Sequence, residues 1–338
     1  MTKVPKKILN DPRRAVTEMI DGLLAASDGR TRRLPGLDAL VKTTLPADRV
    51  ALLIGGGSGH EPLFHGFVGD NMGDGAACGQ VFAAPAPHVI YETAKALDRG
   101  RGILFLYGNY AGDTMNFDIA AEMLQDEGID VRTIRISDDV AAAPPERKHD
   151  RRGIAGDLLM IRVAGGAVAT LGTLDEVERV VNKAGDWVRS MGVAVSAGSI
   201  PETGKLTFEL ADDEIEVGMG AHGEAGFARQ KLASADVVAD QMIEKILSDL
   251  PFVPGDEVAL LINNLGATTM MEMLVVNRRL RQRLDEAGIR VHRTDVGTWL
   301  TVQEMAGFSI TLMKLDDELK GLLDMPCRSV GFSNMGAA

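Results

Sequence analysis

Short apolar runs that alternate with helix-like spacing most constrain what this chain can fold into. Residues 50–54, 102–107 and 131–136 are short apolar segments, which are typical of buried strands. Between them, residues 89–97 and 117–127 carry apolar side chains at helical spacing. This alternation predicts βαβ units, in which helices cover the faces of a largely parallel sheet.

The length of 338 residues favours two domains, because a typical domain holds about 150. We place the boundary at residue 188, which gives an N-terminal domain of residues 1–188 and a C-terminal domain of residues 189–338. The second part also contains strand-like runs, at residues 258–262 and 308–313, and a long helical pattern. We therefore expect two α/β domains with predominantly parallel or mixed sheets flanked by helices.

Charge and composition exclude several classes of protein. The chain has 48 acidic and 36 basic residues, a net charge of −12, whereas a general nucleic-acid binder needs a basic surface. Its apolar runs are shorter than the ~20 residues that cross a bilayer, and the basic residues 1–10 precede no apolar signal segment. Cys78 and Cys327 lie too far apart for a zinc motif and fit a reducing compartment. We expect a cytoplasmic protein that binds neither nucleic acid nor membranes.

Four glycine-rich segments each follow a predicted strand: residues 55–61, 109–113, 218–224 and 263–266. Ligands bind at the carboxyl ends of strands in open α/β sheets, and glycine lets a backbone approach a ligand closely. Four such tips on one side of a sheet would line a cleft. The first segment lacks the lysine of a phosphate-binding loop and is not a dinucleotide fingerprint. Taken alone, it is equally typical of a tight strand-to-helix turn.

Two of the six histidines, His60 and His222, lie inside these glycine-rich segments. Because glycine supplies no neighbouring side chains, packing is a weak reason for a histidine there, although a hydrogen-bonded loop histidine remains an alternative. The histidines have no spacing typical of a metal site. The others are predicted to be ordinary loop or surface residues: His65, His88, His149 and His292.

Asp113 ends the second glycine-rich segment. A carboxylate at this point can act as general base toward a substrate hydroxyl, or it can cap a helix that begins at Thr114. Together with His60 and His222, it forms a set that suits a small polar substrate with carbonyl or hydroxyl groups. The methionines of the later helical pattern are expected in the core: Met270, Met271 and Met273.

Several motifs in one order resemble the dihydroxyacetone kinase family, and specifically its substrate-binding K subunit. The resemblance runs from about residue 10 to residue 330. It rests on residues 55–62, 109–113, 151–156, 218–226, 263–268 and 307–312. It implies two α/β domains, the first with glycine-rich substrate loops and the second with a covalently binding histidine, in a homodimer.

The resemblance also implies a role for each candidate residue. His222 corresponds to the histidine that adds to the ketone carbon and forms a hemiaminal. His60 corresponds to the histidine that hydrogen-bonds the bound triose, and Asp113 to the acid that takes the proton of the reacting hydroxyl. The backbone of Gly57, Ser58 and Gly59 corresponds to the substrate-cradling loop. Covalent capture would select ketones and aldehydes over glycerol, which has no carbonyl.

Phosphoryl transfer requires a nucleotide, yet the chain has no phosphate-binding lysine loop and no magnesium-ligand cluster. The resemblance implies that a separate L subunit carries the nucleotide with Mg²⁺. That subunit would exchange ATP, or hold ADP that a phosphotransferase-system M subunit rephosphorylates. Because the chain ends at residue 338, we expect it to be half of an enzyme that itself holds no metal and no cofactor.

One departure from the family pattern concerns the substrate. Many K subunits have lysine before the Asn-Tyr of the second motif, where this chain has Gly108. The change removes a cation and leaves room, so a four-carbon ketose such as erythrulose is an alternative to dihydroxyacetone. A non-catalytic ketose-sensing protein is a second alternative, although such a sensor has no need of Asp113. A nicotinamide dehydrogenase is a weaker one because its fingerprint is missing.

Overall fold

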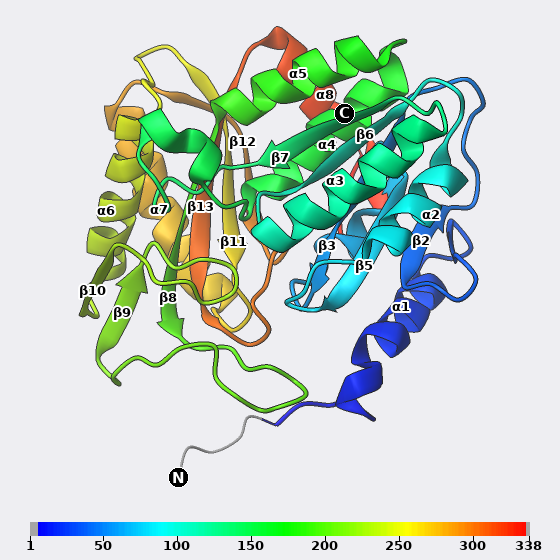
Figure 1. The fold of residues 1–338 in the computed structure, drawn as a ribbon. Helices are drawn as coiled ribbons and strands as arrows, with labels where there is room; N and C mark the ends of the chain where they lie inside the picture. The colour runs from blue at the N-terminus through cyan, green and yellow to red at the C-terminus, as the bar shows by residue number, and fades with distance from the viewer. Residues whose placement is uncertain (1–5, 336–338) are drawn as a thin grey trace. The chain divides into compact units, whose positions relative to one another are not determined.

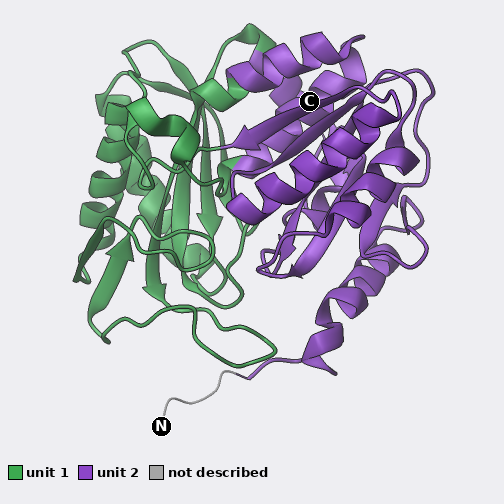
Figure 2. Ribbon diagram, in the orientation of Figure 1, with its two compact units in different colours: residues 1–5, 137–156, 184–318 green, residues 6–136, 157–183, 319–338 purple. Residues whose placement is uncertain are grey.

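The computed structural model describes residues 6–335, which form two compact units (Figures 1 and 2). Unit 1 comprises Ser137–Gly156 and Ala184–Glu318, and unit 2 comprises Lys6–Ile136, Asp157–Lys183 and residues 319–335. Each unit contains a six-stranded sheet with helices. The predicted class of two α/β domains is therefore confirmed. Residues 1–5 of the basic N-terminal stretch lie outside the described residues.

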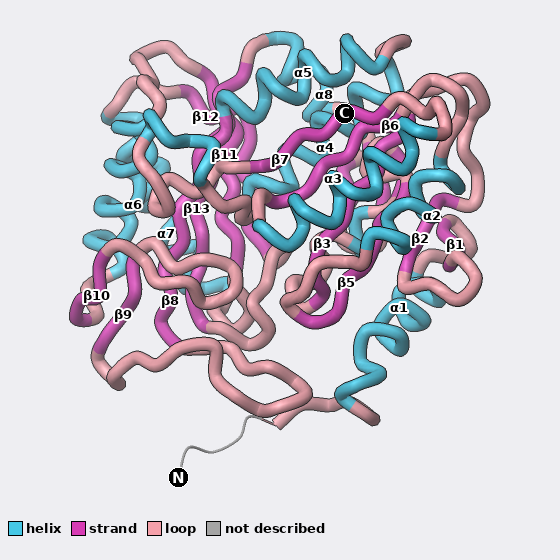
Figure 3. The backbone as a smooth tube through the Cα atoms, in the orientation of Figure 1, coloured by secondary structure: helices cyan, strands magenta, loops and turns pink. Residues whose placement is uncertain are grey.

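The sheet of unit 2, whose strands are magenta in Figure 3, is parallel in the part that carries the first two glycine-rich segments. Its strand order is β1-β2-β5-β3-β6-β7, in which β5, β3, β6 and β7 pair in parallel while β1 and β2 are antiparallel. The strands are β1 (Thr31–Arg33), β2 (Ala39–Lys42), β3 (Ala51–Ser58), β5 (Gly75–Val81), β6 (Ile103–Gly108) and β7 (Val131–Ile136). The apolar runs predicted as strands therefore become β3, β6 and β7.

The helices α2 (Pro87–Leu97) and α3 (Ala111–Asp126) pack against this sheet (Figure 1). Their apolar faces and the strands form one core, in which the rings of Tyr107 and Phe117 stack with centroids 4.1 Å apart. The other helical elements of this part of the chain are η1 (Pro12–Arg14), α1 (Ala15–Ala26), η2 (His65–Phe67), α4 (Gly156–Thr170), α5 (Leu174–Trp187) and α8 (Asp317–Asp324).

The sheet of unit 1 is mostly antiparallel, with strand order β10-β9-β8-β13-β11-β12. Only β11 and β12 pair in parallel. The strands are β8 (Val188–Ser196), β9 (Glu214–Val217), β10 (Ala228–Lys231), β11 (Glu257–Asn264), β12 (Arg290–Gly297) and β13 (Ala306–Leu315).

The helices α6 (Ala235–Asp249) and α7 (Met270–Glu286) complete the core of unit 1. Thr269 and Glu272 form a capping box that starts α7. Met273 is buried in the core, as predicted, but Met270 and Met271 are exposed, so their predicted burial is wrong. Both precede Met273 on the first turn of α7, where the helical period turns their side chains off the buried face. Within residues 6–335, no helix is both long enough and apolar enough to cross a membrane.

The contacts in the structure assign two segments to a different unit from the one that a single division at residue 188 would give. Residues 319–335 contribute β14 (Cys327–Ser329) and β15 (Ser333–Asn334), which form a small sheet with β4 (Gly69–Asp70) of unit 2. Ser137–Gly156, which includes η3 (Pro145–Asp150), belongs to unit 1. Both assignments depend on strand pairings and ion pairs between residues that are far apart in the chain. Local sequence patterns do not reveal such contacts.

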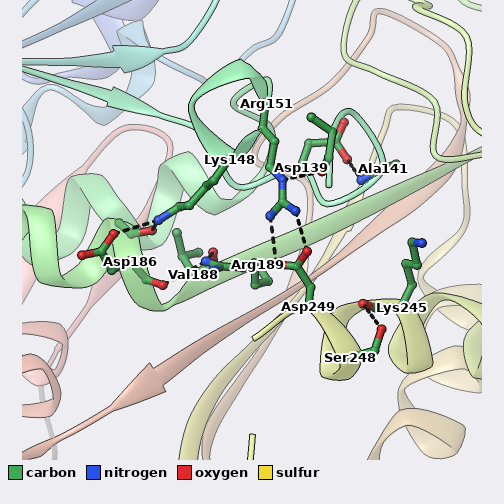
Figure 4. Close-up of polar contacts among 12 residues, drawn as sticks. Asp139, Ala141, Lys148, Arg151, Asp186, Val188, Arg189, Lys245, Ser248 and Asp249 are labelled. Atoms are coloured by element: carbon green, nitrogen blue, oxygen red, sulfur yellow. Dashed lines mark hydrogen bonds and ion pairs between the residues drawn. The ribbon is translucent and has the colours of Figure 1, made fainter. Parts of the chain in front are cut away.

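Buried ion pairs hold Ser137–Gly156 in unit 1 (Figure 4). The Arg151 side chain is 0% exposed, and its guanidinium donates to both carboxylate oxygens of Asp249, at 2.9 and 2.5 Å. Arg189 Nε donates to the same carboxylate, at 2.5 Å. Burial raises the pKa of Asp249, but hydrogen bonds and charge from the two arginines outweigh it and lower this pKa below its usual range. The resulting stabilisation is present above about pH 4 and is lost as the pH falls further.

Replacement of Asp249 by Ala is expected to lower the free energy of unfolding by about 3–5 kcal/mol, because two buried guanidinium groups lose their carboxylate. Urea-induced unfolding at pH 7 measures the change. Asp213 is the matched control, since its ion pair with Lys231 is exposed. Asp213→Ala should cost less than about 1 kcal/mol. Equal costs for the two variants would contradict this account of the buried pair.

Candidate functional site

Two of the glycine-rich segments lie at the same edge of the sheet in unit 2. β3 continues through the glycines to Ser58 and is followed directly by Gly59 and His60. β6 ends at Gly108, four residues before Gly112 and five before Asp113. Because β3 and β6 are paired in parallel, their carboxyl ends meet at one edge. In this unit the expectation that the tips share an edge is therefore met.

The glycines of the first segment let it pack closely against the chain that follows β5. Gly59 has φ = +100°, and a Cβ there would lie 2.7 Å from Cε1 of Phe82. A Cβ on Gly57 would lie 3.0 Å from the backbone nitrogen of Ala83. A Cβ on Gly59 would therefore clash, and the positive φ of Gly59 also favours glycine, whereas a Cβ on Gly57 would make a tight contact.

The side chain of Ser58 holds this segment in place through two hydrogen bonds. Its hydroxyl lies 2.6 Å from the carbonyl oxygen of Gly79 and 2.8 Å from Nε2 of His65. A hydroxyl has one proton, and the carbonyl can only accept, so the proton of Ser58 goes to Gly79. His65 Nε2 must then donate to Ser58 Oγ, which defines the tautomer of this imidazole.

His65 is 1% exposed, so its prediction as an ordinary loop or surface residue is wrong. It belongs to the short helix η2, which is buried throughout. Burial lowers the pKa of His65 to about 4 and thereby keeps the imidazole neutral. No local sequence pattern indicates this role, because the contact with Ser58 depends on a turn between the two residues.

His60 lies in the same glycine-rich segment as Ser58 and is 4% exposed. Its ring centroid is 5.0 Å from that of Phe82, with the two planes tilted by 42°. The neighbouring Glu61 accepts a hydrogen bond from the Gly59 backbone N–H at 2.9 Å. Burial raises the pKa of Glu61, and hydrogen bonds from the Gly59 and Glu61 backbone offset part of that rise. His60 is thus held both by ring contact and by the folding of its own loop.

Asp113 lies in the first turn of α3 and is 9% exposed. The helix begins at Ala111 with Tyr110 as its N-cap, so Asp113 does not cap a helix starting at Thr114. That alternative is wrong because the helix starts three residues earlier than the side-chain pattern suggests. A carboxylate in the first turn is stabilised by the helix dipole. Because Asp113 lies shortly after the end of β6, it remains the candidate general base.

Gly108, at the end of β6, has a tyrosine and a carboxylate beside it. A Cβ on Gly108 would lie 3.3 Å from Cε2 of Tyr110 and 3.6 Å from Oδ2 of Asp157. Asp157 belongs to the first turn of α4 and is 2% exposed. Sequence reasoning did not single out Asp157, because it is distant in the chain from the motif that it adjoins.

His222 lies in the loop that follows β9 in unit 1, and its side chain is 26% exposed. Its backbone N–H donates to Oε2 of Glu224 at 2.8 Å, and its Nδ1 lies 3.1 Å from Oε1 of the same carboxylate. Burial alone would raise the pKa of Glu224, but the hydrogen bonds and charge of His222 lower it to about 2. Glu224 is therefore an ionised partner of the imidazole.

Arg152 lies close to the pair formed by His222 and Glu224. Nη1 of Arg152 is 4.0 Å from Oε2 of Glu224, and its Nη2 donates to the carbonyl oxygen of Gly218 at 3.2 Å. Nε and Nη2 of Arg152 both donate to Oδ2 of Asp139, at 3.0 and 2.7 Å. Burial raises the pKa of Asp139 to about 6, although the charge and hydrogen bonds of Arg152 oppose this rise. Sequence reasoning assigned no role to Glu224, Arg152 or Asp139.

The fourth glycine-rich segment lies at the opposite edge of the unit 1 sheet from the third. Three successive antiparallel pairings separate β9 from β11, so the carboxyl ends of these two strands lie at opposite edges of the sheet. Residues 263–266 therefore cannot line one cleft with the His222 loop, and the expectation of four tips on one side is wrong. Asn263 instead holds a loop, by accepting from the backbone N–H groups of Trp299 and Leu300.

Among residues 6–335, no group of three or more His, Cys, Asp or Glu side chains is placed to hold a metal ion. Cys78 and Cys327 are both buried and free of disulfide bonds.

The chain belongs to the Dak1 domain family, whose pattern it matches over residues 21–331. It is 44% identical, over 95% of its length and 97% of the relative, to the dihydroxyacetone-binding subunit DhaK of a PTS-dependent dihydroxyacetone kinase from Listeria innocua. It is 39% identical to an L-erythrulose 1-kinase of Mycolicibacterium smegmatis, matching over 96% of this chain and 57% of that longer protein.

Solved structures with this fold include both a kinase and a regulator. The dihydroxyacetone kinase of C. freundii, solved in complex with AMP-PNP and Mg²⁺, matches with a TM-score of 0.89 and 30% identity over 97% of this chain and 61% of that one. A dihydroxyacetone kinase operon co-activator, DhaQ, matches with a TM-score of 0.88 and 29% identity over 94% and 98% of the two chains. The fold alone therefore does not decide between catalysis and regulation.

The buried His65 is expected to make the protein less stable as the pH falls from 6.5 to 4. The folded state binds its proton only near a pKa of about 4, whereas the unfolded chain binds it near 6.5. The stabilisation is complete above 6.5, and about 3 kcal/mol is lost on acidification to 4. His65→Gln should flatten this part of the pH dependence of the unfolding free energy. His149→Gln is the control, because its side chain is 79% exposed, and it should leave the curve unchanged.

Proposed function

We propose that this chain is the ketose-binding K subunit of a kinase of the dihydroxyacetone kinase type. It binds a short-chain ketose covalently and presents the terminal hydroxyl for phosphorylation. The observation that carries the proposal is the edge of the unit 2 sheet, where the Gly57–Ser58–Gly59 backbone, His60 and the Asp113 carboxylate follow paired strands. The 44% identity to a dihydroxyacetone-binding subunit supports the substrate class.

In this proposal His222 captures the ketone. The lone pair of one ring nitrogen forms a bond to the carbonyl carbon, and the electron pair of the C=O π bond moves to oxygen, which takes a proton from water. The product is a hemiaminal. His60 donates a hydrogen bond to the bound ketose. Covalent capture fixes the substrate, so its terminal hydroxyl no longer needs to be held by weak contacts alone.

Asp113 acts next as the general base. It takes the proton of the terminal hydroxyl as that oxygen attacks the phosphoryl group. Phosphoryl transfer depends mainly on positioning and charge stabilisation, and this chain supplies the positioning of the acceptor. Asp113 is suited to this role because the first turn of α3 stabilises its ionised form.

The phosphoryl donor belongs to a partner in this proposal. An L-type subunit carries ATP or ADP with Mg²⁺, and in the second case a phosphotransferase-system M subunit restores the phosphate. The partnership is supported by the PTS-dependent subunit from Listeria and by the longer kinase chain solved with AMP-PNP and Mg²⁺. We further propose that the K subunit itself is a homodimer.

A four-carbon ketose is the second candidate substrate. Because Gly108 has no side chain, Tyr110 and Asp157 lie close to its backbone: a Cβ there would be 3.3 Å from Cε2 of Tyr110 and 3.6 Å from Oδ2 of Asp157. A carboxylate accepts hydrogen bonds from a hydroxyl, so an additional hydroxymethyl group could be recognised there. The similarity to an L-erythrulose 1-kinase favours this candidate.

A regulatory protein without turnover is the competing class, and the co-activator fold relative gives it weight. Such a protein would capture a ketose but would not need a base. Asp113 is 9% exposed in the first turn of α3, and a carboxylate can act as a general base, a function that capture alone does not require. Activity in the presence of an L-type subunit distinguishes the two classes.

Capture and turnover should separate in two variants. Carbon-13 NMR with a ketone labelled at its carbonyl carbon is expected to show conversion to a tetrahedral carbon in wild type and none in His222→Ala. Asp113→Asn should retain capture and lose about 10²–10⁴-fold in phosphorylation when an L-type subunit and ATP are supplied. His149→Ala serves as the exposed control. Retained capture in His222→Ala would refute the covalent step, and full capture with no wild-type turnover would favour the regulator.

The role of Gly108 is tested by restoring bulk and charge in separate steps. If position 108 admits the extra carbon of a tetrulose, Gly108→Lys should lower kcat/KM for erythrulose relative to dihydroxyacetone by about 10–200-fold. Gly108→Ala adds only the Cβ, which Tyr110 must yield to by a few tenths of an ångström, and should have a smaller effect. An unchanged ratio in both variants would assign substrate choice to other residues.

A further inference from the structure

We propose that Glu224 is a positioning residue that fixes the His222 imidazole in the tautomer with its proton on Nδ1, so that Nε2 is the nucleophile. The inference rests on the proposed capture of a ketone by His222 and adds the group that makes this histidine nucleophilic.

Glu224 contacts His222 through both carboxylate oxygens. Oε2 accepts the backbone N–H at 2.8 Å, while Oε1 lies 3.1 Å from Nδ1. An ionised carboxylate can only accept hydrogen bonds, so Nδ1 must be the protonated nitrogen. In a neutral imidazole Nε2 then holds the lone pair. The backbone contact fixes the histidine main chain relative to the same carboxylate, which restricts the orientation of the ring.

The ionised state of Glu224 has structural support. The pKa of Glu224 is raised by burial and lowered more strongly by His222, to about 2. The Arg152 guanidinium, 4.0 Å away, adds positive charge on the other side. The Arg152 side chain is held in position, because its Nε and Nη2 donate to Asp139, which is itself 0% exposed. Asp139 in turn accepts from the Ala141 backbone N–H at 3.0 Å (Figure 4).

Gly220 creates the space in which these groups meet. A Cβ there would collide with Oε2 of Glu224 and lie 2.5 Å from Nη1 of Arg152. The backbone N–H of Gly220 also donates to the Glu224 carbonyl oxygen at 3.0 Å, which closes the loop. The glycine-rich sequence around His222 therefore serves the approach of a carboxylate and a guanidinium to the histidine.

The carboxylate also matches the charge that capture creates. When Nε2 bonds to the carbonyl carbon and the oxygen takes up a proton, the ring keeps its Nδ1 proton and becomes positively charged. Glu224 then faces a cationic ring across the same 3.1 Å contact. A preorganised opposite charge stabilises the adduct more than it stabilises the neutral ring, so it favours capture.

Glu224→Gln is the sharpest test because the side chain keeps its shape. The amide has one oxygen and one NH₂ group, so it cannot accept from both the backbone N–H and Nδ1 of His222. If its oxygen keeps the backbone contact, its NH₂ donates to Nδ1 and drives the proton to Nε2. Nitrogen-15 NMR of protein labelled at the histidine rings reports which nitrogen is protonated, and His222→Ala assigns the signals.

We expect wild-type His222 to be protonated on Nδ1 and Glu224→Gln to shift the proton to Nε2. Ketone capture, followed by carbon-13 NMR, should weaken by about 10–100-fold in the variant, as when other carboxylate partners of a functional histidine are removed. Glu216→Gln is the matched control. Glu216 is a buried carboxylate under the same loop and accepts from the Gly226 backbone N–H at 2.9 Å, not from His222. It should change neither signal.

The two readouts keep this inference separate from the proposed function. An Nε2-protonated ring in wild type, or unchanged tautomer and capture in Glu224→Gln, would overturn the role of Glu224. If wild type captures no ketone, the proposed function fails, and the inference fails with it as a statement about catalysis. In that case an Nδ1-protonated ring that shifts in Glu224→Gln would still establish that Glu224 positions the imidazole.

Discussion

Two consecutive arginines connect the stability of unit 1 with its functional loop. Arg151 turns toward Asp249, the last residue of α6, where a carboxylate alone would be opposed by the helix dipole. Arg152 turns toward Asp139 and the carboxylate beside His222. Because neighbouring residues of an extended chain point to opposite sides, one short segment supplies both the buried Arg151 and the partly buried Arg152. The core and the His222 loop therefore depend on the same placement of Ser137–Gly156.

Glycine has different physical tasks in the three loops, although the sequence repeats the same residue. Gly59 adopts a positive φ and packs against an aromatic ring, whereas Gly220 makes room for a carboxylate and a guanidinium. Gly108 is flanked by Tyr110 and Asp157, and we propose that the missing side chain there affects what can be bound. Of these positions, only Gly108 enters our proposal on substrate size. A glycine-rich pattern thus marks a functional loop without saying which atom the glycine accommodates.

The sequence predicted the features that are encoded locally. The strands β6 and β7 and the helix α2 agree with the apolar runs and helical spacing within one or two residues. His60, Asp113 and His222 were selected as candidates because of the glycines around them, and their roles stay predictions. The order of strands in unit 1 was not predictable, because antiparallel and parallel pairing use the same short apolar runs. Glu224 lies only two residues from His222, but its other charged neighbour, Arg152, lies 72 positions earlier in the chain. Such partners become visible only when the fold brings them together.

A neutral sugar poses a particular binding problem for this chain. The net charge of −12 cannot attract a ketose electrostatically, and a molecule with so few heavy atoms gains at most about 1.5 kcal/mol from each in noncovalent contact. A bond to His222 would retain the substrate without relying on either source of affinity. The same bond needs a lone pair on a defined ring nitrogen, and in our proposal Glu224, 3.1 Å from Nδ1, fixes which nitrogen carries it. On this reasoning, a small neutral substrate requires covalent capture, and covalent capture requires the acidic partner of the histidine.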